Sequence, residues 1–225
     1  MFGFLLGLAS LAVGAIGSIV TTIGTAVATA AKTFIALAPK LESLVAVANV
    51  ITGIAQIVGT LSMDESAEDI GAKAMQEGVR HREPEESAED YLNYIRNDVE
   101  LDKERQAAMD QKDRMAAAAI GSALVLEATV EKSNVNLTPE YIVDASKAGL
   151  SPRDTLSIGR NLEKSSANGV DSFGPFLRQE LDAADYLAAS AAITEALRAD
   201  YPDLSEREIK NEVIQMERAL CADET

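Results

Sequence analysis

The sequence has few of the residues that carry most enzyme chemistry. Among 225 residues there is no tryptophan, one histidine (His81) and one cysteine (Cys221). A single cysteine excludes an internal disulfide framework, and no Cys/His cluster has the spacing of zinc ligands. His81 lies in a charged segment and Cys221 has no histidine near it in sequence, so no nucleophile–base pair is visible. We therefore predict a protein that is not an enzyme and that uses no metal and no cofactor.

Charged residues are missing from the start of the chain. The first is Lys32, and only two more precede Asp64. These three residues contribute +1 to the formal net charge of −16, so residues 64–225 carry −17. So acidic a segment repels phosphate backbones, and no Lys/Arg cluster with interleaved aromatics offsets it, which argues against nucleic-acid binding. The composition predicts two parts: a glycine- and alanine-rich apolar segment, 1–63, and an acidic, all-helical soluble domain, 64–225.

The apolar segment has the pattern of a helical hairpin. Residues 1–38 read as one long helix or as a helix with a bend, and Pro39 then interrupts the pattern. Residues 40–63 resume it as a second apolar helix. Each run reaches the roughly 20 residues that a helix needs to cross a bilayer. The tip of this hairpin contains Lys32, Pro39 and Lys40.

The acidic segment is predicted to be helical throughout. Residues with high helix propensity dominate it, N-cap residues stand before two prolines, and no alternating strand pattern occurs. The predicted fold class is therefore all-α, an apolar N-terminal helical hairpin followed by a multi-helix acidic bundle. The individual predictions are helices over 65–78, 86–132 and 175–200, a loop over 78–84, and helix starts at Thr138, Ser151 and Ser205, the last with Glu208 as capping-box partner.

Small residues recur along the first apolar helix at alternating spacings of four and three. On a continuous helix this spacing places them on one face, which we call the small-residue seam. Small residues let helix backbones approach closely, which is how helices associate in lipid. The seam therefore predicts close helix–helix packing. Its members are Gly3, Gly7, Ser10, Gly14, Gly17, Thr21, Gly24, Ala28 and Ala31.

Uncharged polar residues recur at helical spacing along the second apolar helix. One interpretation is that they line a narrow water-filled path, with the acidic residue at its mouth favouring cations. The other is that Asn49 and Gln56 bond across to the first helix and fix the register of the hairpin. This polar stripe consists of Glu42, Asn49, Thr52, Gln56 and Thr60.

The apolar segment also has alternative interpretations as a whole. It either inserts into a membrane or forms a tightly packed hairpin inside a soluble bundle. A secretory signal is a weaker reading, although Ala28-Thr29-Ala30 resembles a cleavage site. The apolar run is too long for a signal core and no positive residues precede it. We therefore expect a protein that reaches a membrane without a standard signal peptide.

A glycine- and alanine-rich apolar hairpin over residues 1–63, followed by an acidic helical remainder, resembles the pore-forming antibacterial effectors of type VI secretion. The resemblance rests on architecture and composition, and no diagnostic motif carries it. It implies insertion into the inner membrane of a target cell, homo-oligomerisation into a small ion-conducting pore and depolarisation. It also implies a delivery or holding partner, such as the secretion tube protein, and a cognate immunity protein.

A second class of function fits the same composition. A phage virion or ejection protein also uses long alanine-rich helices, and its apolar N-terminal helices pack against partner subunits or enter the host envelope. Such a protein is virion-associated. A holin-like lysis protein is a third interpretation, which the size of the acidic part disfavours.

Overall fold

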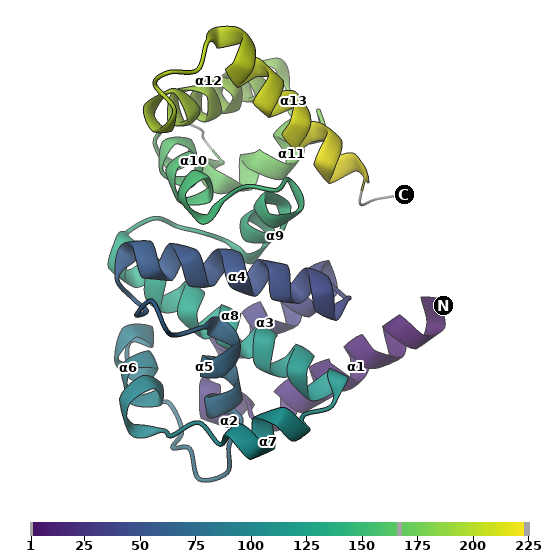
Figure 1. Ribbon diagram of the computed structural model, residues 1–225, viewed down its shortest axis with the longest axis vertical. Helices are drawn as coiled ribbons and strands as arrows, with labels where there is room; N and C mark the ends of the chain where they lie inside the picture. The colour runs from purple at the N-terminus through teal and green to yellow at the C-terminus, as the bar shows by residue number, and fades with distance from the viewer. Residues whose placement is uncertain (1, 166–167, 223–225) are drawn as a thin grey trace. The chain divides into compact units, whose positions relative to one another are not determined.

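The computed structural model describes residues 2–165 and 168–222, with side chains described for 7–165 and 168–220. Every element in these residues is a helix, which confirms the all-α prediction (Figure 1). The chain divides into two compact units, Met1–Ser133 and Asn134–Thr225. Each unit has its own apolar core.

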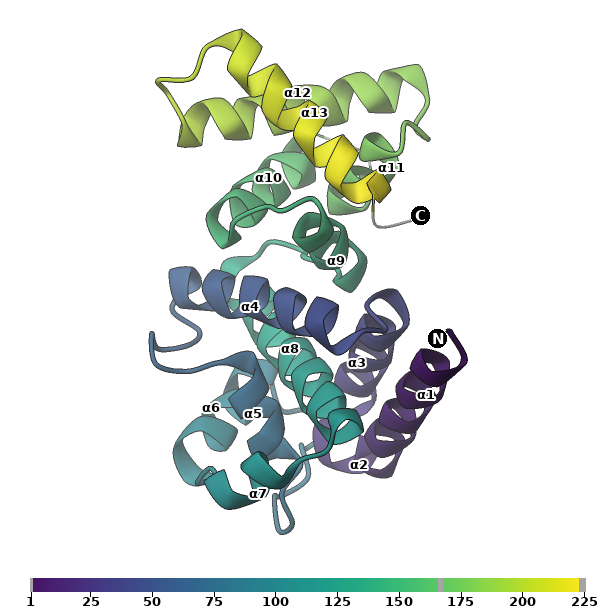
Figure 2. The same cartoon turned by 45° about the vertical axis from the view of Figure 1, so that its right-hand side comes forward.

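The first unit is built around one central helix, α8, which contacts α1, α3, α4, α5 and α6 (Figures 1 and 2). Residues 115–126 of α8 carry no charge and are all buried, so this helix is apolar on every face and is surrounded by its neighbours. The helices of this unit are α1 (Phe2–Ser18), α2 (Val20–Ile23), α3 (Thr25–Leu37), α4 (Leu41–Val58), α5 (Ala67–Ala74), α6 (Ala88–Asp98), α7 (Lys103–Ala108) and α8 (Gln111–Ser133).

Helices α5 and α8 cross with their backbones in direct contact. A Cβ atom added at Gly121 would lie 1.7 Å from the carbonyl oxygen of Ala67, and one added at Gly71 would lie 1.8 Å from that of Ala117. Only glycine permits so close an approach, because any side chain would overlap the facing main chain. The Gly71–Gly121 crossing therefore fixes the distance between two core helices.

The unit boundary lies between Ser133 and Asn134, whereas the change in composition lies at 63/64. The difference has a physical reason. The apolar segment does not pack on itself alone, because α3 and α4 bury Phe34, Leu44 and Ile51 within the unit whose central helix is α8. The predicted hairpin thus shares one core with the acidic helices up to α8.

Residues 2–37 form three helices, so of the two forms predicted for residues 1–38 the bent one holds. Gly24 separates α2 from α3 with a φ of 85°, a backbone conformation that glycine adopts without strain. The second apolar helix ends at Gly59, whose φ of 80° places it in the left-handed conformation common at helix C-termini. The loop predicted over 78–84 is confirmed.

Two predicted long helices are wrong. Residues 86–132 form α6, α7 and α8, because the Asp102 side chain accepts a bond from the Arg105 amide and so starts a new helix. Residues 175–200 likewise divide into α11 and α12, the latter capped by Asp182. The predicted helix starts at Thr138, Ser151 and Ser205 are confirmed. Each of these hydroxyls accepts a hydrogen bond from the main-chain amide three residues later, that of Tyr141, Asp154 and Glu208 respectively.

The second unit is a smaller helical bundle. Tyr141 is fully buried, its hydroxyl donates to the carbonyl of Thr155 at 2.5 Å, and its ring meets Phe173 edge to face. Burial raises the pKa of Tyr141, so the phenol stays neutral. Its helices are α9 (Pro139–Lys147), α10 (Pro152–Ser165), the 3₁₀ turn η1 (Gly169–Ser172), α11 (Phe173–Leu177), α12 (Ala183–Asp200) and α13 (Glu206–Ala222).

Candidate functional site

Helix α1 lies at the edge of the first unit in both views (Figures 1 and 2). It carries no charged residue, and one face docks through Ala12 and Ile16, both fully buried. The opposite face is exposed and includes Leu11, whose side chain is 59% exposed. An uncharged helix of 17 residues that packs on one side only is an apolar surface held at the margin of the fold.

The exposed face of α1 carries the N-terminal part of the small-residue seam. Gly7, Gly14 and Gly17 are exposed, and a Cβ added at any of them would meet no atom within 4 Å. Ala28 and Ala31 of α3 are instead buried. The bend at Gly24 thus separates an open half from a packed half. Ser10 and Thr21 belong to the open half, Gly24 is half-buried, and the surroundings of Gly3 lie outside the described side chains.

Among the described residues, α4 is the one helix that is long and apolar enough to span a bilayer, and 39% of its 18 residues are buried. Length and composition alone do not separate a spanning helix from the core helix of a globular protein. At the start of α4, the predicted hairpin tip has Pro39 and Lys40 exposed and Lys32 half-buried. The tip is therefore a surface turn.

The polar stripe of α4 does not face a single path in this structure. Glu42 and Asn49 are exposed, whereas the Thr52 hydroxyl accepts a hydrogen bond from the Ala67 amide at 2.9 Å. The Gln56 amide donates to three carbonyls in the following loop. Thr60 is buried, 3% exposed. Thr52 and Gln56 thus hold the end of α4 to the residues that follow it. The Gln56 side chain does not bond to the first helix, as one interpretation of the sequence had it.

Two groups of charged residues hold the two ends of the α3–α4 segment to the acidic helices. The first, which we call the Arg82 latch, acts at the α2–α3 bend. The Arg82 amide donates to the Thr22 carbonyl at 2.8 Å, and the guanidinium packs near Gly24. The same guanidinium bonds both carboxylate oxygens of Glu127 on α8 and the carbonyl of Glu86. Arg82 therefore ties the bend to the central helix, through its main-chain amide on one side and its guanidinium on the other.

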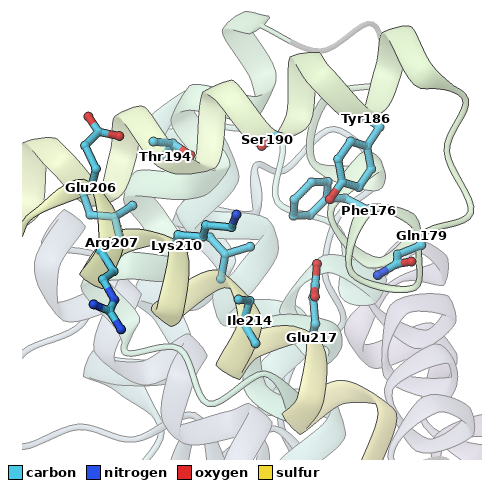
Figure 3. Close-up of a pocket in the computed structure, with 12 residues that line it drawn as sticks. Phe176, Gln179, Tyr186, Ser190, Thr194, Glu206, Arg207, Lys210, Ile214 and Glu217 are labelled. Carbon is cyan, nitrogen blue, oxygen red and sulfur yellow. The ribbon is translucent and has the colours of Figure 1, made fainter.

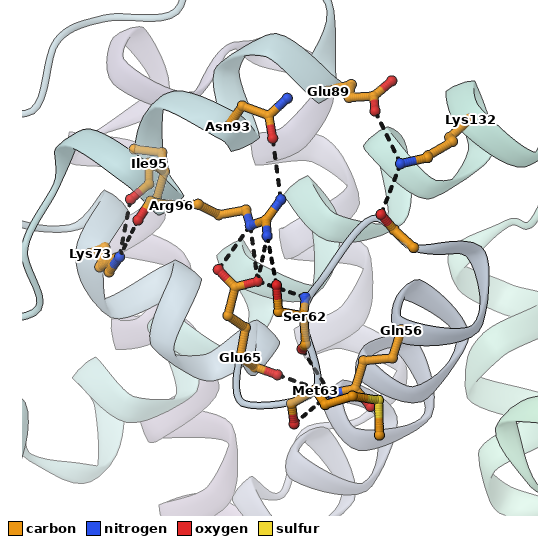
Figure 4. A network of polar contacts seen from close by, with 11 residues as sticks. Gln56, Ser62, Met63, Glu65, Lys73, Glu89, Asn93, Ile95, Arg96 and Lys132 are labelled. Carbon is orange, nitrogen blue, oxygen red and sulfur yellow. Dashed lines mark hydrogen bonds and ion pairs between the residues drawn. The ribbon is translucent and has the colours of Figure 1, made fainter.

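The second group, the Arg96 latch, holds the loop after α4 (Figure 4). The Arg96 guanidinium pairs with Glu65 at 2.7 Å and donates to the Ser62 hydroxyl at 3.1 Å. Nearby, the Lys132 ammonium donates to the carbonyl of Gly59 at 2.8 Å and lies 3.4 Å from Glu89. These contacts join the end of α4 to α6 and α8.

Acidification is expected to weaken the Arg96 latch. Partial burial acts to raise the pKa of Glu65, but hydrogen bonds from Arg96 and Ser62 outweigh it and hold the pKa below its ordinary value of 4.5. The folded state therefore binds fewer protons than the unfolded state. The resulting stability is present above pH 4.5 and is lost as the pH falls through the lowered folded-state pKa.

Urea unfolding of the wild type and of Glu65→Gln at pH 7 and pH 3 tests this expectation. The wild type should be more stable at pH 7, and the difference between the two proteins should shrink at pH 3. An equal difference at both pH values would contradict a role for the ionised carboxylate.

Sequence reasoning missed both latches. Arg82 and Glu127 are 45 positions apart and Arg96 and Glu65 are 31 apart, so no local pattern joins them. Arg80 contributes beside them, stacked at 4.2 Å on the Tyr94 ring and paired with Glu86. The only available signal was the concentration of arginines around the predicted loop.

The sequence offers one histidine and one cysteine for acid–base or nucleophilic chemistry. His81 is exposed in the loop before α6, and the side chain of Cys221 lies outside the described residues. Within the described residues, no group of three or more His, Cys, Asp or Glu side chains is placed to hold a metal ion. Comparisons of this chain with protein-family models, with curated proteins and with solved structures find no match.

Proposed function

We propose that this protein is a membrane-active effector that inserts its N-terminal apolar helices into a target membrane, oligomerises there and conducts ions. The observation that carries the proposal is α1, an uncharged helix attached by one face and exposing the open half of the small-residue seam on the other. A surface of this kind is stable only where something apolar covers it. A lipid bilayer and neighbouring copies of the same helix supply that cover.

The arrangement suggests an order of events. Helix α1 contacts its own unit through one face, so it leaves first, with the break at Ile19 between α1 and α2 as its pivot. Helices α3 and α4 follow only when the Arg82 latch and the Arg96 latch open, because these hold both ends of the α3–α4 segment. Their core-facing side chains, including Phe34 and Ile51, are apolar and can face lipid after release.

In the inserted state, close packing of α1 helices along the seam would form the oligomer, and the polar stripe of α4 would line the conducting path. Thr52 and Gln56 would first give up the hydrogen bonds that they make in the resting structure. The polar stripe would then have new partners in the pore; its residues are Glu42, Asn49, Thr52, Gln56 and Thr60. The same proposal includes delivery by a secretion tube or a holding protein that covers α1, and an immunity protein in the producing cell. The target is the inner membrane, where ion flow causes depolarisation.

Lipid photo-crosslinking tests insertion directly. The full-length protein is mixed with liposomes that contain a lipid with a photoreactive acyl chain, irradiated, digested and mapped by mass spectrometry. Labelled peptides should come from residues 1–63. Labelling spread evenly over 1–63 and 139–222, or none in the presence of folded protein, would contradict the proposal.

Opening a latch should increase insertion. Arg82→Met keeps the length of the side chain but removes its bonds to Glu127 and Glu86. Hydrogen bonds to charged groups contribute about 1.5–3 kcal/mol, so we expect insertion into liposomes, followed by acyl-chain photolabelling, to become at least several-fold faster. Arg160→Met, an exposed arginine on α10, is the matched control and should insert at the wild-type rate. A slower or unchanged rate for Arg82→Met would remove the Arg82 latch from the route.

A specific observation favours a second candidate, an assembly protein of the virion type. Helices α3 and α4 share the core with α8, so their release requires unpacking the first unit, whereas α1 can dock on a partner subunit without any unfolding. In that case the open half of the seam packs against a partner helix. The photo-crosslinking experiment separates the two candidates, because a docking role leaves residues 25–63 unlabelled.

A further inference from the structure

The second unit contains a cavity of about 610 Å³ between α12 and α13 (Figure 3). This size lies within the range of small-molecule sites, roughly 300–1,000 Å³. Its apolar floor comes from Ile209, Val213 and Ile214 of α13, spaced so that they share one face of the helix. Helix α12 faces them with the hydroxyls of Ser190 and Thr194.

The two ends of the cavity differ in charge. At one end the rings of Phe176 and Tyr186 lie 4.8 Å apart, and the Glu217 carboxylate points toward them (Figure 3). At the other end the Lys210 ammonium points toward Ser190 and Thr194 (Figure 3). The cavity thus has a negative, aromatic end and a positive, hydroxyl-lined end.

Neither of the two charges is used by the fold. Among residues 168–220, Lys210 and Glu217 make no ion pair and no side-chain hydrogen bond, whereas Glu206 at the rim pairs with Arg198. Two opposite charges on one helix, aimed into one cavity and not paired with each other, are available to a ligand that carries both signs. Glu217 is half-buried and Lys210 is exposed, so a ligand that carries both signs gains a charge-assisted contact at each of them.

Backbone strain lies at the same place. Gln179 lines the aromatic end and has a φ of 58°, a left-handed conformation that non-glycine residues adopt at a cost of about 1–3 kcal/mol. Such strain is often retained at binding sites. The positive φ turns the chain after α11 and leaves the Gln179 side chain at the rim of the cavity (Figure 3).

We propose that the α12–α13 cavity binds a short zwitterionic peptide. Its ammonium group lies at the Glu217 end, where the half-buried Tyr186 ring adds cation–π attraction, and its carboxylate lies at Lys210. Lys210 and Glu217 are seven positions apart on α13, which places their Cα atoms about 10 Å apart along the helix axis. An extended chain spans about 3.3–3.6 Å per residue, so a tripeptide has the matching length.

Isothermal titration calorimetry of the full-length protein with the tripeptide Phe-Ala-Ala tests this proposal. Saturable binding is expected, and N-acetylation and C-amidation should each weaken it at least tenfold, because each removes one charge-assisted contact. Lys210→Met and Glu217→Gln should each weaken binding of the uncapped peptide by a similar factor. Lys210→Met should not weaken the amidated peptide further.

Two matched variants outside the cavity serve as controls. Arg218→Gln on α13 and Glu195→Gln on α12 change the same charges at exposed positions and should bind as the wild type does. Thermal unfolding checks that every variant is folded. The absence of saturable binding by the folded wild type would overturn the proposal. Equal binding of the doubly capped peptide, or equal losses in the control variants, would overturn it as well.

Discussion

Gly121→Ala is expected to destabilise the first unit by about 3 kcal/mol, a large share of a typical domain's stability. The added methyl group would lie 1.7 Å from the Ala67 carbonyl oxygen and 2.8 Å from the Gly71 amide nitrogen. The obstacle is main chain rather than a flexible side chain, so α5 and α8 must move apart. Urea unfolding followed by circular dichroism measures the loss, and Gly71→Ala should give a similar one.

Gly14→Ala is the matched control for this prediction. Gly14 also lies inside a helix, but a Cβ there meets nothing within 4 Å, so the substitution should stabilise α1 by up to about 1 kcal/mol through helix propensity. The two changes are chemically identical and should have opposite signs. If Gly121→Ala unfolds at the wild-type urea concentration, the close crossing of α5 and α8 does not exist in solution.

The double substitution Gly14→Leu with Gly17→Leu is expected to abolish membrane permeabilisation while leaving the fold intact. Both positions are exposed and open, so leucine meets no obstacle in the resting protein. In the inserted oligomer the same side chains would hold the α1 backbones apart and prevent seam packing. Dye release from liposomes should fall to background, while the urea midpoint should be no lower than that of the wild type, because leucine favours the helix more than glycine does.

The control for this loss is a leucine pair on the same helix that avoids the seam. Ala9→Leu with Ala15→Leu adds the same apolar bulk at half-buried positions beside it, and should retain substantial dye release. Background release from both doubles would point to apolar bulk in general rather than to the seam. Full release from Gly14→Leu with Gly17→Leu would show that the seam has no part in the activity.

The parts of the fold that sequence reasoning predicted correctly are those set by local contacts. Thr138, Ser151 and Ser205 each bond an amide three residues on, so their helix starts are legible without tertiary structure. The breaks inside 86–132 had the same kind of signal in Asp102 and Asp110, but the helix-favouring residues around them obscured it.

The parts that sequence reasoning could not predict depend on distant pairs. The seam assumed a continuous first helix, whereas the left-handed φ at Gly24 and the Arg82 latch bend it. The composition predicted a boundary at 63/64, because nothing local shows that residues 115–126 of α8 provide the core on which α3 and α4 pack. The Gly71–Gly121 crossing also joins residues of different helices.

Release of α3 and α4 from that core has a consequence for α8. Its buried stretch, residues 115–126, loses its cover when the apolar helices leave. A chain that begins at residue 64 would expose the same surface permanently and is therefore a poor control for membrane activity. Single-site variants of the full chain keep the resting fold and are the better comparison.

The central claim is that the N-terminal helices build an ion-conducting pore, and single-channel recording in a planar lipid bilayer tests it most directly. Purified, detergent-free, full-length protein should produce discrete current steps, and Gly14→Leu with Gly17→Leu should produce none. Absence of current from wild-type protein whose folding has been verified would contradict the claim, and would leave α1 as a docking element for a partner subunit.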